Sequence, residues 1–351
     1  MSDAGTLFAD VLGRLIRREE LPVPLAEDAL AMILRGEATD AQIAGFAVAL
    51  RAKGESPAEL AALVRTMVRF AEPVPVPDAA EVIDTCGTGG DRAGTVNVST
   101  MAALVAAGAG ARVAKHGNRA ASSQCGSADV LEALGVVIDL APDGVAHCIE
   151  EVGIGFCFAP RFHPALRFAG PVRRELGVPT TFNFLGPLAN PAGVGRQSVG
   201  VSDPAMAERV VGALAALGKA HVMVFHGHDG LDELTTTGPS TVHELRNGEV
   251  RRVEIDPSDF GIPRATLGDL VGGDAATNAA IVREVLDGAR GPVRDIVCLN
   301  AAAALVVADL ADDLPTGIEL AGAVIDDGRA ASTLERFVVA STREREREAD
   351  A

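Results

Sequence analysis

Residues 82–100, VIDTCGTGGDRAGTVNVST, decide the fold expected of this chain. The apolar run at 82–85 predicts a β-strand, and an Ala-rich stretch that opens at 97–100 predicts a helix. Between them, glycines at 87, 89 and 90 lack the Cβ atoms that would keep a backbone from wrapping an anion. Because the helix start adds unpaired N–H groups and a positive dipole end, the segment predicts a phosphate-binding loop. An ordinary glycine turn with a helix cap is the alternative.

Side chains at the predicted helix start support the prediction of a phosphate-binding loop. Asn97, Ser99 and Thr100 can cap the helix or reach the same anion, and the Ser99 hydroxyl is also a candidate oxygen ligand for a phosphate-bound cation.

A second cluster of anion donors follows the next apolar run. Residues 115–119, KHGNR, come after 111–114 and lead into Ser122, Ser123 and the segment GSAD at 126–129. Since the carboxyl ends of parallel strands meet at one edge of a sheet, both loops are expected in one crevice. Lys115 is one of only three lysines among 31 Lys+Arg residues. A lysine kept beside a candidate phosphate loop in an arginine-rich chain suggests a role for its compact ammonium, which differs physically from a guanidinium. Placement by chance is the alternative.

Composition limits the classes of function. A chain of 351 residues with 48% hydrophobic residues can bury a sizeable core and form two subdomains. The net charge of −17 argues against nucleic-acid and anionic-membrane partners, so a polyanionic substrate would need local positive charge and a metal. Five scattered cysteines without a C-x-x-C spacing indicate reduced thiols, and no signal peptide or membrane span is evident. We therefore expect a soluble, cytoplasmic protein. Cys86 and Cys125 flank the two loops and could act as nucleophiles, but no histidine partner is evident for either.

The chain divides at a proline-rich linker. Residues 1–72 read as a helical domain, and EPVPVP at 72–77 is a stiff connection to an α/β domain at 78–351. Short β-branched runs alternate there with helical stretches, which predicts a mainly parallel central sheet flanked by helices. The expected strands are 82–85, 112–114, 136–138, 154–158 and 221–225, and Asn247-Gly248 predicts an antiparallel hairpin between 242–245 and 250–255. The last third is helical, with a Glu/Arg tail expected to fray.

Three further groups of residues could carry chemistry. Asp232 and Glu233 follow a predicted strand and suit Mg²⁺, with a solvated acidic turn as the alternative. His226 and His228 could bind a transition metal but have no third ligand. A basic stretch could supply an arginine for a substrate carboxylate, or could be a helix surface, since adjacent arginines cannot both face inward. It consists of Arg161, His163, Arg167, Arg173 and Arg174.

Taken in order, these motifs make the chain recognisable. DTCGTGGD at 84–91, NVST at 97–100, KHGNR at 115–119, RRELG at 173–177, FNFLGPL at 182–188 and DE at 232–233 closely resemble the anthranilate phosphoribosyltransferases of tryptophan biosynthesis. The resemblance covers essentially the whole chain. It implies phosphoribosyl pyrophosphate and anthranilate as substrates, N-(5-phosphoribosyl)anthranilate and pyrophosphate as products, Mg²⁺ as cofactor and a cytoplasmic homodimer formed through the helical domain.

The same resemblance implies roles for individual residues. Phosphoribosyl pyrophosphate would be held by Gly87, Gly90, Asp91, Thr95, Asn97, Ser99, Thr100, Lys115 and Ser127. Anthranilate would contact Gly87, His116, Asn118 and Arg173, and Mg²⁺ would be held by Ser99, Asp232 and Glu233. The implied fold is nucleoside phosphorylase/phosphoribosyltransferase-like, with a segment around 161–180 packing back onto the N-terminal helices. The sequence departs from the family pattern at Leu166 and Phe168, near the amine site.

No catalytic side chain is assigned, and the chemistry accounts for that. An aromatic amine is neutral at pH 7 and needs no strong base, so metal, N–H donors and positioning are the groups required. Two other readings remain: a pyrimidine nucleoside phosphorylase-like enzyme, which shares the fold class but would be longer, and a non-catalytic nucleic-acid-binding paralogue, which should carry a basic sheet mouth.

Overall fold

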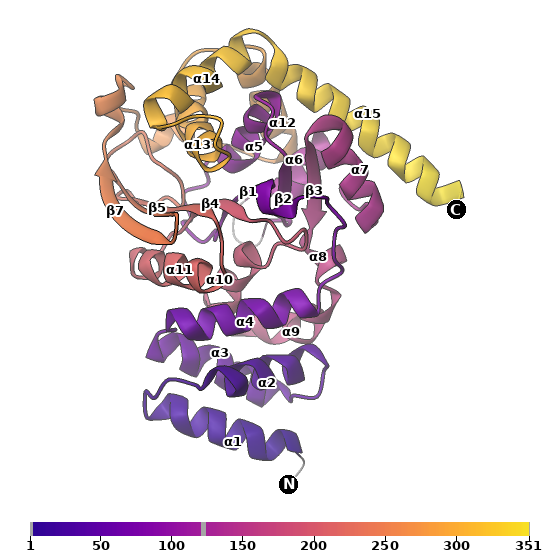
Figure 1. Ribbon diagram of the computed structural model, residues 1–351, viewed down its shortest axis with the longest axis vertical. Helices are drawn as coiled ribbons and strands as arrows, with labels where there is room; N and C mark the ends of the chain where they lie inside the picture. Colours follow the sequence, from indigo (N-terminus) through magenta and orange to yellow (C-terminus); the bar gives the residue numbers. More distant parts are fainter. Residues whose placement is uncertain (1–2, 121–123, 351) are drawn as a thin grey trace.

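The computed structural model describes residues 3–120 and 124–350, so Ser122 and Ser123 of the second loop lie outside the described residues. The chain starts with α1 (Asp3–Ile16), α2 (Val23–Leu34), α3 (Asp40–Lys53) and α4 (Pro57–Arg69), stacked at the lower end of Figure 1. Capping boxes start α3 at Thr39 and α4 at Ser56. The sequence S-P-A-E at 56–59 accounts for the second one, because the Ser56 hydroxyl accepts from the N–H of Glu59 and the Glu59 carboxylate accepts from the N–H of Ser56.

A seven-stranded sheet forms the centre of the molecule. Its strands are β1 (Ile83–Gly87), β2 (Val113–Gly117), β3 (Ile154–Phe158), β4 (Arg196–Gly200), β5 (His221–Gly227), β6 (Ser240–Arg246) and β7 (Glu249–Ile255). The spatial order is β3-β2-β1-β4-β5-β6-β7, with parallel pairing through β5 and antiparallel pairing of β6 and β7. The predicted mainly parallel sheet and the hairpin at Asn247-Gly248 are confirmed.

Helices cover both faces of the sheet, as Figure 1 shows. α5 (Val98–Gly108) and α13 (Pro292–Val307) pack on one face, and α11 (Pro204–Ala216) packs between the other face and α4. Alternation along β5 matches these layers: Val222 and Val224 belong to the core on the α11 side, whereas Met223 and Phe225 belong to the core on the α13 side. The remaining helices are α6 (Ser127–Ala133), α7 (Pro142–Val152), α8 (Ala159–Phe162), α9 (Gly170–Leu176), α10 (Thr181–Leu188), α12 (Ala275–Leu286), α14 (Leu314–Asp326) and α15 (Arg329–Asp350), with 3₁₀ turns η1 (Ala79–Glu81), η2 (Pro164–Phe168), η3 (Pro257–Phe260) and η4 (Leu267–Leu270).

The N-terminal helices share their apolar core with parts of the chain far away in sequence. One cluster of buried residues runs from α1–α4 through α10 and α11 to the sheet. η2 packs on α2, α9 packs on α3, and α10 contacts both α3 and α4. The segment between β3 and β4 therefore lies between the helices and the sheet, and it can close one side of a crevice at the strand ends.

One expected strand is absent, and one strand was not predicted. Residues 136–138 form no strand, because the N–H of Val137 donates to the Ser341 hydroxyl of α15 at 3.0 Å instead of to a neighbouring strand. Conversely, β4 was missed because its sequence RQSVG has no apolar alternation. Gln197 and Ser198 are nevertheless buried, since both faces of a central parallel strand are covered.

The Glu/Arg tail does not fray, contrary to the expectation. It is the second half of α15, which packs along α7 in Figure 1. Glu348 accepts a hydrogen bond from the N–H of Ala141 at 2.7 Å, and Glu344 lies 2.9 Å from Nδ1 of His147. Charged side chains therefore hold this helix end against the domain, which a composition argument cannot detect.

The strand order marks where a ligand can bind. From β1 the chain continues to β2 and β3 on one side and then crosses to β4 and β5 on the other, so the carboxyl ends of β1 and β4 form a switch point. In the described part of the chain, no helix is both long and apolar enough to span a bilayer.

Candidate active site

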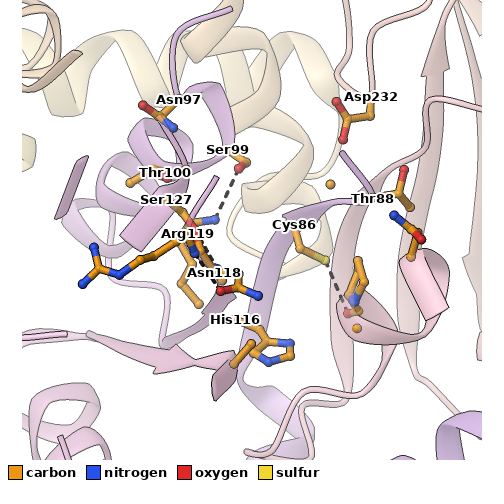
Figure 2. Close-up of a pocket in the computed structure, with 18 of the residues that line it drawn as sticks. Cys86, Thr88, Asn97, Ser99, Thr100, His116, Asn118, Arg119, Ser127 and Asp232 are labelled. Carbon is orange, nitrogen blue, oxygen red and sulfur yellow. Dashed lines mark hydrogen bonds between the residues drawn. The ribbon is translucent and has the colours of Figure 1, made fainter. Parts of the chain in front are cut away.

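A cavity of about 340 Å³ opens at the carboxyl ends of β1 and β2 and is bounded on its other side by α9 and α10. Every residue that the sequence assigned to substrate or metal lines it, with the exception of Gly90. Gly90 lies in the turn after β1, outside the lining. Figure 2 shows Asn97, Ser99 and Thr100 on one side of this cavity and Thr88 and Asp232 on the other. The two anion loops and the acidic pair thus form a single site.

The glycine loop and the acidic loop touch each other. The N–H of Gly89 donates to Oδ2 of Asp232 at 2.7 Å. A Cβ atom on Gly87 would overlap that carboxylate, and one on Gly200, at the end of β4, would overlap the backbone carbonyl of Asp232. Glycine is therefore required at the ends of both strands so that Asp232 can approach the sheet.

Lys115 supplies a buried positive charge beneath the loops. Its side chain is almost fully buried, and its Nζ donates to the carbonyl of Thr85 at 2.7 Å and to the Ser99 hydroxyl at 3.3 Å. Burial lowers the pKa of this ammonium. Since an ammonium has three N–H donors, one is left for a ligand in the cavity that Lys115 lines.

A buried carboxylate fixes the strand that carries Lys115. Asp84 accepts from the N–H of His116 at 3.0 Å and from Nδ2 of Asn190 at 2.8 Å. Burial raises the pKa of Asp84 to about 6, and the neighbouring Lys115 charge opposes the shift. Asp84 and Asn190 thus hold the ends of β1 and β2 in register without lining the cavity.

Three carboxylates, those of Asp91, Asp232 and Glu233, line the cavity close enough for their charges to interact. Burial, and then the charge of Asp91, raises the pKa of Asp232 to about 7. Burial and the Asp232 charge also raise the pKa of Glu233. Mutual repulsion of this kind is relieved by a cation, and carboxylate and hydroxyl oxygens are the donors that Mg²⁺ prefers, so the group fits that ion. Asp232 is only 8% exposed, so the alternative of a solvated acidic turn was wrong.

Protein side chains alone do not complete a metal site. Within residues 3–120 and 124–350, no group of three or more His, Cys, Asp or Glu side chains is arranged to hold an ion. His226 and His228 therefore have no third ligand of these types among the described residues, as the sequence already indicated, and nothing in the structure favours a transition metal there. A cation near Asp232 would take its other ligands from a substrate.

Two histidines form the far wall of the cavity. The rings of His116 and His163 lie 5.1 Å apart, and burial lowers their pKa values to about 3 and about 4. Both are therefore neutral at pH 7. Nε2 of each ring is buried and has no hydrogen-bond partner among the described residues. His163 was expected only as part of a basic stretch, and no sequence signal identified it as a neutral member of the site.

Of the basic stretch, only Arg173 offers a charge to the cavity. Arg173 lines it with Cζ 5.6 Å from the ring of Phe182, and in the part of the chain that the structure describes its guanidinium makes no ion pair. Burial lowers its pKa. Arg174 is exposed and Arg161 pairs with Glu72 at 2.6 Å. The expectation that the adjacent arginines cannot both face inward is confirmed.

The two departures from the family pattern have different locations. Leu166 lines the cavity, as Arg173 does. Phe168 does not: its ring lies against Gly36, in the turn between α2 and α3. Of the two, only Leu166 can touch a ligand in this cavity.

Several lining residues had been noted only as motif members or not at all. They are Thr88, Arg119, Ala159, Phe182, Asn183, Gly186 and Pro187. Asn97 stands at the N-cap of α5 but makes no capping hydrogen bond, so of the two roles considered for it, capping or reaching an anion, the first is not realised. Its amide instead donates to the Cys125 carbonyl at 3.2 Å and accepts from Asn278 at 2.9 Å, so it links the loop after β2 to α12. Burial raises the pKa values of the Cys86 and Cys125 thiols, which opposes a nucleophilic role for either.

Comparisons with known proteins agree with the resemblance read from the motifs. Residues 79–331 match the model of the glycosyl transferase family a/b domain, and residues 9–71 match the helical bundle domain of that family. Anthranilate phosphoribosyltransferase of Salinispora arenicola is 55% identical over 94% of this chain and 96% of its own length, and that of Roseiflexus castenholzii is 53% identical over 95% and 98%.

Solved structures give the same result. Anthranilate phosphoribosyltransferase from Thermus thermophilus superposes with a TM-score of 0.90 at 44% identity, covering 95% of this chain and 99% of that one. The enzyme from Saccharomyces cerevisiae, solved in complex with PRPP and Mg, superposes with a TM-score of 0.88 at 28% identity, covering 98% and 99%. The chain belongs to the anthranilate phosphoribosyltransferase family, with the helical bundle and a/b domains of the glycosyl transferases.

Proposed function

We propose that this chain transfers the phosphoribosyl group of phosphoribosyl pyrophosphate to the amine of anthranilate, giving N-(5-phosphoribosyl)anthranilate and pyrophosphate in tryptophan biosynthesis. The observation that carries the proposal is one cavity lined by the two glycine-containing loops, by the acidic pair and by Arg173, an arginine with no ion pair among the described residues. Relatives solved with PRPP and Mg and with 4-fluoroanthranilate support it.

Each wall of the cavity has a proposed ligand. Phosphoribosyl pyrophosphate lies against the loop after β1, the start of α5, Lys115 and Ser127, with Gly90 shaping the turn from outside the lining. Mg²⁺ is held by Ser99, Asp232 and Glu233, and when bound it neutralises charge on the leaving pyrophosphate. Anthranilate lies against Gly87, His116, Asn118 and Arg173, with its carboxylate on the guanidinium.

The reaction then needs positioning more than acid or base catalysis. The anthranilate nitrogen forms a bond to ribose C1 while the bond from C1 to the pyrophosphate oxygen breaks. Pyrophosphate keeps that electron pair, and the nitrogen releases one proton to water. Arg173 orients the amine toward C1, and the neutral rings of His116 and His163 line the acceptor side without adding a positive charge next to the positive charge that develops on the sugar.

Loss of anthranilate fluorescence is the test of this proposal. Purified protein should consume anthranilate only when phosphoribosyl pyrophosphate and Mg²⁺ are both present. Phosphorolysis of uridine by inorganic phosphate, with no consumption of anthranilate, would favour the nucleoside phosphorylase-like reading instead.

Domain division and assembly are part of the proposal. We assign residues 1–72 and 78–351 to the two domains, with 161–180 packed on the first, and we assign a cytoplasmic homodimer formed through the helices. Large apolar side chains exposed on α1, α3 and α4 support the dimer: Ile16 is 77%, Val48 44% and Val68 40% exposed. A solution mass of one 36.0 kDa chain would contradict it.

Arg173→Ala should raise the KM for anthranilate by roughly one to two orders of magnitude, because a charge-assisted hydrogen bond to the carboxylate is lost. The KM for phosphoribosyl pyrophosphate should change little. Arg174→Ala is the matched control, since Arg174 is adjacent but exposed outside the cavity. Steady-state kinetics with each substrate varied checks both; equal shifts in the two constants would mean that Arg173 acts on folding or closure.

Lys115→Ala should weaken the binding of phosphoribosyl pyrophosphate by about 1.5–3 kcal/mol, as for a hydrogen bond to a charged group. Lys115→Arg should weaken it too, because a planar guanidinium cannot repeat the two contacts of Nζ in a buried space. Calorimetry at fixed Mg²⁺ and ionic strength measures both. Lys219→Ala is the control, since Nζ of Lys219 donates to the Val194 carbonyl away from the cavity. Native affinity in Lys115→Ala would make the lysine incidental.

A further inference from the structure

Asn300 lies within α13, is only 3% exposed and has its side-chain amide fully engaged. Its Oδ1 accepts a hydrogen bond from the N–H of Leu234 at 2.9 Å, and its Nδ2 donates to the carbonyl of Leu234, also at 2.9 Å. A third hydrogen bond runs from Nδ2 to the carbonyl of Ile296, one turn earlier on the same helix, at 2.9 Å. One side chain thus holds both backbone polar groups of a residue in another part of the fold.

The residue that Asn300 holds directly follows the acidic pair. Leu234 belongs to the loop between β5 and β6 and comes right after Asp232 and Glu233. Its side chain is completely buried, and it lies in neither a helix nor a strand. Without Asn300, the N–H and the carbonyl of Leu234 would be buried without these partners, and burying unpaired backbone groups is costly.

The rest of the loop is fixed at other points. Oδ2 of Asp229 accepts from the Thr235 hydroxyl at 2.6 Å and from the Thr237 hydroxyl at 2.5 Å, which closes the loop on itself. Gly89 holds the Asp232 side chain from the glycine loop. The two hydrogen bonds between Asn300 and Leu234 attach the backbone next to Glu233 to the helical layer that covers the sheet.

Asn300 and Glu233 also border the same small space. A cavity of about 10 Å³, room for at most one water molecule, is lined by both residues together with Thr85, Ser99 and Ser198. Asn300 does not line the large cavity and so cannot touch a substrate there. Asn300 precedes the Ala-rich run AAAALVV at 301–307. Asparagine is unfavourable inside a helix, so helix propensity does not explain an asparagine at this position.

We propose that Asn300 is a positioning residue for the acidic wall: by holding the Leu234 backbone at two points, it fixes where Glu233 and Asp232 present their carboxylates to Mg²⁺. The assignment of Mg²⁺ to those carboxylates rests on the proposed function, whereas the hold on Leu234 stands on the hydrogen bonds alone.

Two variants and one control test the proposal. Asn300→Asp keeps the shape and the acceptor for the Leu234 N–H but removes both donors, and Asn300→Ala removes all three hydrogen bonds. Leu305→Ala, which removes buried apolar volume five residues further along α13, controls for general destabilisation of this helix. The measurements are amide hydrogen exchange at 229–237 in the free protein and the Mg²⁺ concentration that gives half-maximal turnover.

Asn300→Ala should exchange the Leu234 amide roughly tenfold faster, because the acceptor of that N–H is lost. Asn300→Asp should do the same although it keeps an acceptor, because the carboxylate oxygen that replaces Nδ2 would lie against the Leu234 carbonyl and repel it. Both variants should need roughly tenfold more Mg²⁺, while the KM for anthranilate stays within about twofold of the native value. Leu305→Ala should lower the melting temperature and change neither quantity. If the alanine variant does not fold, the aspartate variant decides. Native exchange at Leu234, or a native Mg²⁺ requirement, in a folded Asn300 variant would overturn the proposal. Absence of turnover in the unsubstituted protein would instead contradict the proposed function, because the exchange measurement needs no substrate.

Discussion

Replacing Asp232 by Asn and Glu233 by Gln together should lower Mg²⁺-dependent turnover by roughly a thousandfold or more, because both proposed carboxylate ligands of the cation are lost. The fold should survive. The amides keep the shapes of the side chains, the amide oxygen that replaces the Asp232 carboxylate can still accept from the N–H of Gly89, and two buried like charges are removed.

The measurement is the initial rate over a range of Mg²⁺ concentrations, with thermal unfolding as the check on the fold. Glu249→Gln with Asp259→Asn is the matched control, since it neutralises two exposed carboxylates of the same chain outside the cavity. An unchanged Mg²⁺ dependence in the Asp232 and Glu233 double variant would remove the metal assignment.

Gly200→Ala should lower kcat/KM by roughly two orders of magnitude, since displacing a reacting group by about 1 Å costs that much. The added methyl would overlap the carbonyl oxygen and carbon of Asp232, and these are backbone atoms that cannot turn aside. The acidic loop must therefore move away from the end of β4, and Asp232 moves with it.

Gly322→Ala in α14 is the control, because the nearest atom to its new Cβ is 3.7 Å away, at the distance of an ordinary van der Waals contact. Circular dichroism and steady-state kinetics separate a local effect from unfolding. A folded Gly200→Ala protein with native kcat/KM would show that the close approach of Asp232 to the end of β4 has no part in the site.

The sequence predicted those parts of the site that follow from strand ends and residue chemistry. Glycines at 87, 89 and 90 after an apolar run, and Lys115 after another, indicated two anion loops, and the parallel strands bring them together. Asp232 and Glu233 were found for the same reason, since they follow β5. Local patterns suffice where function depends on the residue type at the end of a strand.

Other features depend on contacts between distant segments, and no local pattern shows them. β4 is buried by the elements around it, although its sequence is polar and has no apolar alternation. The strand, and Gly200 at its end, were therefore not predicted. The segment at 136–138 has the composition of a strand but gives its N–H to Ser341, more than 200 residues away. Asn300 reads as an ordinary helix residue until Leu234 is seen beside it. Packing also decided the charge of His163, which burial holds neutral.

The most direct test of the proposed transfer is the ratio of anthranilate consumed to pyrophosphate released, measured in one reaction with phosphoribosyl pyrophosphate and Mg²⁺. We expect one pyrophosphate for each anthranilate consumed in the unsubstituted protein, and neither change in the Asp232→Asn, Glu233→Gln variant. Release of pyrophosphate without loss of anthranilate, or loss of anthranilate that does not require phosphoribosyl pyrophosphate, would contradict the account.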